Sequence, residues 1–148
     1  MVEISPKVEE IGLVDTLNGI LAFACKKVQE ATGGEYQGFT DWELHRSLHA
    51  LKANPKFTDT PLRYLDYRSV GDCCHSNALE RILFMGGTWG AHHYSISRGR
   101  YQITLGIANC NARIESLREE FGDNKVNQLE DMANELIAQN PIYAGLTA

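Results

Sequence analysis

The sequence lacks the segments that would place it in or across a membrane. No apolar run approaches the roughly 18 residues that a bilayer-spanning helix needs. The first residues contain no basic stretch followed by an apolar one, so we expect no secretory signal there. The formal net charge is −5, and the 14 Lys and Arg are scattered. Because nucleic-acid binders usually carry a basic face, we expect neither a membrane nor a long nucleic acid as a partner.

Cysteine is scarce, and its four occurrences do not form a recognisable framework. Cys73 and Cys74 are adjacent, which makes a disulfide between them strained and rare. Structural zinc sites take cysteine pairs separated by two to four residues, so Cys73, Cys74, His75 and Cys110 match that pattern poorly. We therefore expect reduced thiols and a cytoplasmic location, and we assign no metal site and no cofactor.

Length and composition are typical of one folded unit. The chain has 148 residues, of which 43% are hydrophobic and 22% charged. These values lie in the ordinary globular range and permit a substantial core. We predict a single globular domain over residues 1–148.

Apolar residues at helical spacing, together with capping residues and stops, predict five or six helices. The signals are the start at Ser5–Pro6, the stripe from Val14 to Val28 with Asp15 as its cap, the capping box Thr40–Glu43 with the stop at Asn54–Pro55, the start at Thr60–Pro61, the segment from Asp72 or Ser76 to Gly86–Gly87, the segment from Asn109 or Asn111 to Phe121, and the segment from Val126 to Ile137.

A change of period after Gly87 predicts strands. Apolar and polar residues alternate over 92–97 and again over 101–108, with the turn dipeptide Arg98–Gly99 between them. The predicted fold class is therefore α+β, a helix-rich single domain with one antiparallel β-hairpin around residues 91–108. A lone hairpin is marginally stable, so we expect helices to cover it or dimerisation to extend it into a larger sheet. This favours a homo-oligomer.

Aromatic rings and arginines accompany the predicted hairpin. Arginine forks pair with phosphate or carboxylate oxygens, and flat rings stack on planar groups. An asparagine near a helix N-terminus can join the backbone amides around an anion. We therefore predict a cytosolic binding protein that senses or sequesters a small anionic, nucleotide-like ligand. The predicted ligand-binding residues are Trp89, His92, Tyr94, Arg98, Arg100, Asn109 and Arg113.

The adjacent thiols offer an alternative, a cysteine-dependent hydrolase or transferase. With Asp72 as cap, Cys73 and Cys74 would lie in the first turn of a helix, where the dipole lowers a thiol's pKa. His92 or His93 would then be the general base. Buried cysteines are more often small hydrophobic residues, and the carboxylate of Asp72 would oppose thiolate formation.

A third hypothesis concerns two histidines four residues apart. His45 and His49 project from one face of a predicted helix, and Trp42 shares that face. The zinc-protease motif has glutamate directly after the first histidine, and Arg46 stands there instead. The spacing therefore favours a protein–protein interaction module over a metal site.

Overall fold

Helices make up most of the chain that the structure describes. The structure is a computed structural model, and it describes residues 12–32, 39–70, 73–83, 92–95, 100–103 and 107–140. Five α-helices and two short 3₁₀ helices lie in these ranges. They are α1 (Leu13–Thr32), α2 (Asp41–Ala53), η1 (Pro55–Phe57), η2 (Pro61–Tyr64), α3 (Asn77–Leu83), α5 (Ile107–Phe121) and α6 (Asp123–Gln139). None of these helices combines the length and apolar character needed to cross a bilayer.

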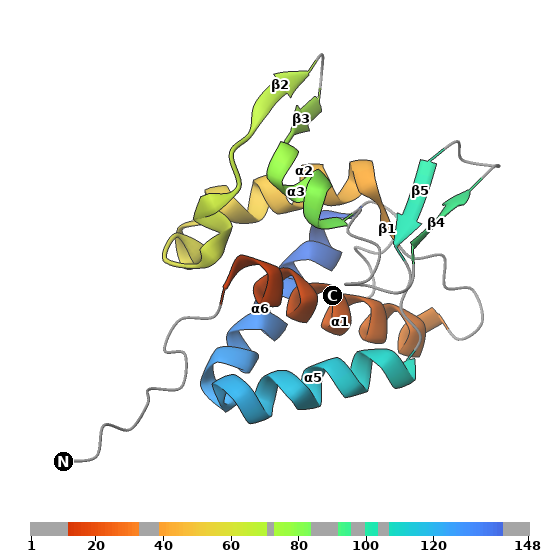
Figure 1. Cartoon of the computed structure of the whole chain (residues 1–148), viewed down its shortest axis with the longest axis vertical. Helices are drawn as coiled ribbons and strands as arrows, with labels where there is room; N and C mark the ends of the chain where they lie inside the picture. Colours follow the sequence, from red (N-terminus) through yellow and green to blue (C-terminus); the bar gives the residue numbers. More distant parts are fainter. Residues whose placement is uncertain are drawn as a thin grey trace.

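The core forms where α1 packs against α5 and α6, with α2 covering the other side (Figure 1). Apolar residues of α1 recur at helical spacing and are fully buried, among them Leu17, Leu21 and Val28. Gly19 lies in the same helix, at a point where a Cβ atom would come within 2.4 Å of the Leu129 side chain of α6. A residue without a side chain thus lets the two helices approach closely.

The strands are short and belong to two groups. They are β1 (Phe39–Thr40), β2 (Arg68–Val70), β3 (Cys73–His75), β4 (His92–Ser95) and β5 (Arg100–Ile103). Strand β5 lies between β4 and β1, and β2 pairs with β3, all antiparallel. The registers place Phe39 and His92 opposite Ile103, and Arg68 opposite His75.

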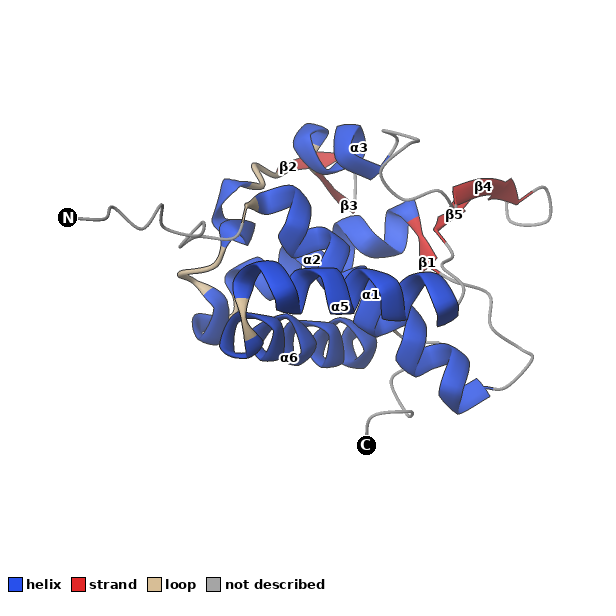
Figure 2. Cartoon of the chain, turned by 60° about the horizontal axis from the view of Figure 1, so that its bottom comes forward, coloured by secondary structure: helices blue, strands red, loops and turns tan. Residues whose placement is uncertain are grey.

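The predicted α+β class is wrong, because the described chain is a helix-rich domain (Figure 2). The strands of residues 92–95 and 100–103 are four residues each, and α5 already begins at Ile107, inside the predicted hairpin around 91–108. Among the described side chains, the buried hydrophobic cluster comes from helical segments and their connections, with Phe39 of β1 the one strand residue. The physical reason is that helices bury one another's apolar faces, so no sheet layer is needed to form the core.

Local capping signals predicted some helix ends and misplaced others. Ser76, not Asp72, precedes α3, and Gly122 separates α5 from α6 with a φ of 87°, a conformation that glycine adopts readily. Asn109 lies within the first turn of α5, and Asp15 lies inside α1, so neither is the cap that we predicted. The backbone amide and the hydroxyl of Thr16 both donate to the carbonyl of Gly12 at the start of α1.

Candidate functional site

Strands β2 and β3 and helix α3 lie on the side of α2 away from α5 (Figure 1). A small polar pocket lies where these three elements meet. Its volume is about 250 Å³. Its lining residues are Asp66, Tyr67, Arg68, His75, Asn77, Ala78 and Arg81. They come from the approach to β2, from β2 itself, from the end of β3 and from α3, so residues within the segment 66–81 supply the whole lining.

Ser76 sets the path of the chain from β3 into α3. Its Oγ accepts a hydrogen bond of 3.1 Å from the backbone amide of Leu79, and its carbonyl accepts one of 3.0 Å from Glu80. Serine is a favoured residue at this position because its side chain satisfies an amide that has no partner within the helix. The buried side chains of Leu79 and Ile82 then anchor α3 on the core.

His75, a lining residue of the pocket, stacks on the imidazole of His45. The rings of His45 of α2 and His75 of β3 lie 4.5 Å apart between centroids, at an interplanar angle of 18°. His45 is 5% exposed, and its Nδ1 accepts a hydrogen bond of 3.1 Å from the backbone amide of Ser76. Because Nδ1 accepts, His45 carries its hydrogen on Nε2. The stack and this bond hold His75 in a defined orientation.

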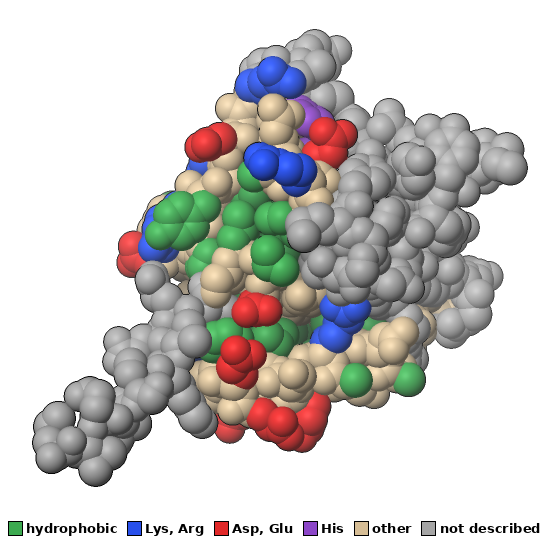
Figure 3. Space-filling view, viewed as in Figure 1, with side chains coloured by type: hydrophobic (Ala, Val, Ile, Leu, Met, Phe, Trp, Pro, Cys, Tyr) green, Lys and Arg blue, Asp and Glu red, His purple; other side chains and the backbone are tan. Residues whose placement is uncertain are grey.

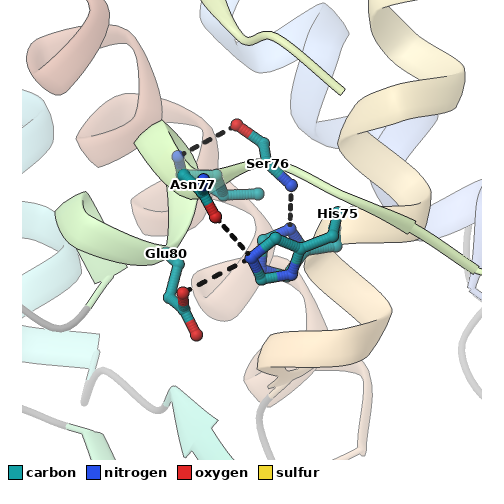
Figure 4. Close-up of polar contacts among 6 residues, drawn as sticks. His75, Ser76, Asn77 and Glu80 are labelled. Atoms are coloured by element: carbon teal, nitrogen blue, oxygen red, sulfur yellow. Dashed lines mark hydrogen bonds and ion pairs between the residues drawn. The ribbon is translucent and has the colours of Figure 1, made fainter. Parts of the chain in front are cut away.

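The outer edge of His75 meets two acceptors from α3. Its Nε2 lies 3.1 Å from Oδ1 of Asn77 and 3.4 Å from Oε2 of Glu80 (Figure 4). An amide oxygen and a carboxylate both accept hydrogen bonds, so this nitrogen carries a hydrogen in the observed geometry. His75 therefore donates from Nε2 toward the two side chains of α3 at the edge of the pocket.

Tyr67 closes the pocket toward α2. Its ring meets that of His49 edge-on at 4.7 Å, and Lys52 Nζ lies 5.8 Å from its centroid. The hydroxyl is buried and has no hydrogen-bond partner among the described residues. Burial, and secondarily the neighbouring Cys74, hold the pKa of Tyr67 well above its usual value of 10.0. The side chain thus stays a neutral phenol.

The pocket is locally basic on an acidic chain. Arg68 and Arg81 line it, both exposed to solvent, against the single carboxylate of Asp66. Figure 3 shows basic, histidine and acidic side chains gathered over this end of the molecule. The chain as a whole has a net charge of −5, whereas the charged side chains that line this pocket are two arginines and one aspartate. Such an arrangement attracts small anions.

The thiols do not occupy the first turn of a helix. Cys73 and Cys74 belong to β3, and α3 begins only at Asn77. The helix-dipole argument for a lowered thiol pKa therefore does not apply to them. The Sγ of Cys74 lies 3.7 Å from the carbonyl oxygen of His45, toward which it donates. For Cys73 the structure describes the backbone alone.

Most of the predicted ligand residues lie where the structure gives no side-chain detail. Trp89 and Arg98 fall outside the described residues, and His92, Tyr94 and Arg100 are described by their backbone alone. The same holds for His93, the alternative general base of the thiol hypothesis.

Two predicted ligand residues can be placed completely, and both lie on α5. Asn109 is exposed. Arg113 donates a hydrogen bond of 2.6 Å from Nη1 to Oδ1 of Asn18 of α1. That bond joins two core helices, so Arg113 has a structural task in this conformation.

The histidines of α2 face two different environments. His45 is buried under His75, whereas His49 is exposed. An interaction face would therefore use His49 rather than His45, and the side chain of Trp42 is not described. Within the described ranges no three His, Cys, Asp or Glu side chains gather closely enough to hold a metal ion.

A larger pocket of about 790 Å³ lies between α1 and α6. Its ionisable lining consists of Lys27, Lys56, Glu30, Asp131 and Glu135. Lys27 also forms an ion pair of 2.9 Å with Glu130. Carboxylates outnumber lysines here, so this pocket does not suit an anion.

Sequence reasoning missed Tyr67, Arg68, Asn77 and Arg81. A signal was present, because Gly71–Asp72 stands between two three-residue segments with β-branched or thiol side chains, and Gly-Asp is a hairpin dipeptide. Taking Asp72 as a helix cap concealed that hairpin.

No family model matches the chain, and neither a curated protein nor a solved structure is found to be similar to it.

Proposed function

We propose that this chain is a binding protein for a small anionic ligand, which it holds in the pocket between β2, β3 and α3. One observation carries the proposal. Arg68 and Arg81 line, together with His75, a pocket of about 250 Å³ on a chain whose net charge is −5. Arginine forks and imidazole N–H groups are the donors that proteins use for phosphate and carboxylate oxygens.

The support beneath the pocket also favours binding. A ligand loses less free energy to ordering when the groups that receive it are already oriented. His75 is oriented by its stack on buried His45, and His45 in turn is held by the amide of Ser76. Arg68 and Arg81 are exposed and can turn toward an incoming anion without exposing the core.

The size of the pocket limits what it can enclose. Sites that enclose whole drug-sized ligands usually measure about 300 to 1,000 Å³. At about 250 Å³, this pocket suits a single anionic group. A nucleotide would place its phosphate here and leave the base outside, near other surfaces of the chain.

The cellular setting and assembly belong to the same proposal. A cytoplasmic location rests on the sequence, whose four cysteines form no recognisable disulfide framework. A homo-oligomer stays a prediction, although β1 supplies a third strand beside β5 from within the same chain.

The test is a binding titration with a variant that removes both guanidinium groups. Isothermal titration of Arg68→Gln/Arg81→Gln would use inorganic phosphate, acetate and a nucleoside monophosphate as probes. We expect the unchanged protein to bind at least one probe, and the double variant to bind it at least ten-fold more weakly, because two charge-assisted contacts are lost. Both side chains are exposed, so the fold should be unaffected.

The matched control is Arg118→Gln/Lys125→Gln, which removes the same charge from α5 and α6. If the control weakens binding as much as the pocket variant, the effect is one of net charge, and the pocket is not the site. Equal affinity of the pocket variant and the unchanged protein for every probe would reject the proposal.

A further inference from the structure

Charged side chains of both signs line the pocket between β2, β3 and α3. Asp66 and Arg68 lie two residues apart in the sequence, where the chain enters β2, and Arg81 belongs to α3. Among the described residues, these three side chains form no hydrogen bond or ion pair with one another or with a further side chain or backbone group. Opposite charges that share a pocket without pairing are all available to a ligand.

The carboxylate of Asp66 determines which anions fit. A ligand that carries only negative charge would be attracted by Arg68 and Arg81 and repelled by Asp66, which lines the same pocket. A ligand that also carries an ammonium group turns this repulsion into an attraction, because the ammonium group donates to the carboxylate. Specificity is a difference between affinities, and a repulsive contact with the wrong ligand contributes to it as an attractive contact with the right one does.

The size and the remaining lining agree with a compact ligand of mixed charge. The volume of about 250 Å³ is below that of sites that enclose whole drug-sized ligands. Because one residue separates Asp66 from Arg68, a ligand that meets both needs opposite charges only a few atoms apart. Ala78 and Tyr67, whose hydroxyl is buried, add apolar surface for the carbon atoms between these charges.

We infer that the ligand is an amino carboxylate, a small molecule whose carboxylate and ammonium groups are a few atoms apart; this rests on the anion binding proposed above. The carboxylate pairs with Arg68 and Arg81, and the ammonium group donates to Asp66. Asp66 is thus the residue that distinguishes amino acids from simple acids and from phosphate. An amino acid with a second carboxylate has a partner charge for each of the three side chains.

The experiment uses pairs of probes that differ only in the ammonium group. Aspartate is compared with succinate, and glycine with acetate, by isothermal titration at neutral pH and equal ionic strength. We expect the amino acid of at least one pair to bind about ten-fold more tightly than its partner, because a charge-assisted hydrogen bond to Asp66 replaces a repulsion. In Asp66→Asn this preference should fall below about three-fold, because the amide has no charge.

Asp59→Asn is the matched control. Asp59 is exposed and lies outside the lining of the pocket, so the substitution removes the same charge from another part of the surface. The preference for the amino acid should change by less than about two-fold, because charges far apart on the surface are screened. Circular dichroism before the titrations checks that each variant is folded.

Different results overturn different statements. Equal affinities within both pairs, or a preference that Asp66→Asn retains, would overturn this inference. Phosphate binding without binding of any of the four acids would do the same, as would an equal loss of preference in Asp59→Asn. Each of these results leaves the proposed anion binding standing, provided that binding depends on Arg68 and Arg81. Binding that ignores both arginines, or no binding of any probe, overturns the two together.

Discussion

Gly19→Ala tests whether helix propensity or packing decides the stability of the α1–α6 contact. Alanine is favoured over glycine within a helix by about 0.5 to 1 kcal/mol. The added Cβ, however, would lie 2.4 Å from Leu129 Cδ1 and 3.2 Å from Leu117 Cδ1. Both leucines are buried, so their side chains have little room to move away. Overpacking of this kind costs about 1 to 3 kcal/mol, and we therefore expect a net loss of stability of about 1 to 2 kcal/mol.

A double-variant cycle separates the two effects. Leu129→Ala alone should cost about 2 to 5 kcal/mol, as for other buried leucines. In that background only the 3.2 Å approach to Leu117 remains, and the space left by Leu129 lets Leu117 move away. Gly19→Ala should then stabilise the protein by up to about 1 kcal/mol. The assay is urea unfolding followed by circular dichroism, with the m-values compared to check that unfolding remains two-state. A single Gly19→Ala variant more stable than the parent, or one destabilised equally in both backgrounds, would refute the packing argument.

The remaining predictions concern buried groups near the site and in the core. Tyr67→Phe removes a buried hydroxyl that has no partner among the described residues, so we expect the free energy of unfolding to rise by about 1 kcal/mol, measured by urea unfolding; a loss of that size would mean that the hydroxyl is bonded. Burial raises the pKa of Cys110 from 9.0 to about 11, so the unfolded chain releases this proton first as pH rises, and stability is lost between those values. Between pH 8 and pH 10.5 that loss is about 2 kcal/mol, and Cys110→Ala should lack it; the same pH dependence in both proteins would contradict the assignment.

The helices were predictable because their signals are local. The stripe from Val14 to Val28 lies within α1, and the capping box beginning at Thr40 marks the start of α2. The stop at Asn54–Pro55 likewise falls directly after α2 ends at Ala53. Apolar spacing and caps depend on residues three or four positions apart, and the sequence displays these directly.

The errors arose where local signals competed. Residues 101–108 alternate as a strand would, yet Ile107 and Ala108 belong to α5, the helix that packs on α1. Tertiary packing of an amphipathic helix supplies most of its stability. In the sequence, Asp72 and Ser76 are equally good candidates for the N-terminal cap of α3. Ser76 is the cap because residues 73–75 pair with β2 as a strand, so the helix can begin only after them. Local propensity is a weak guide when tertiary contacts favour another outcome.

The sequence by itself indicated most of the helical segments and sets the acidic net charge. Only the tertiary structure decided which polar residues meet. The stack of His45 on His75 and the hydrogen bond between His45 and Ser76 join positions about thirty residues apart in the sequence. The hydrogen bond from Arg113 to Asn18 joins positions 95 residues apart. Such contacts have no periodic signal, because they depend on how helices and strands pack after each has formed. The pocket lined by residues within 66–81 therefore depends on how β3 and α3 pack on α2, which the sequence does not display.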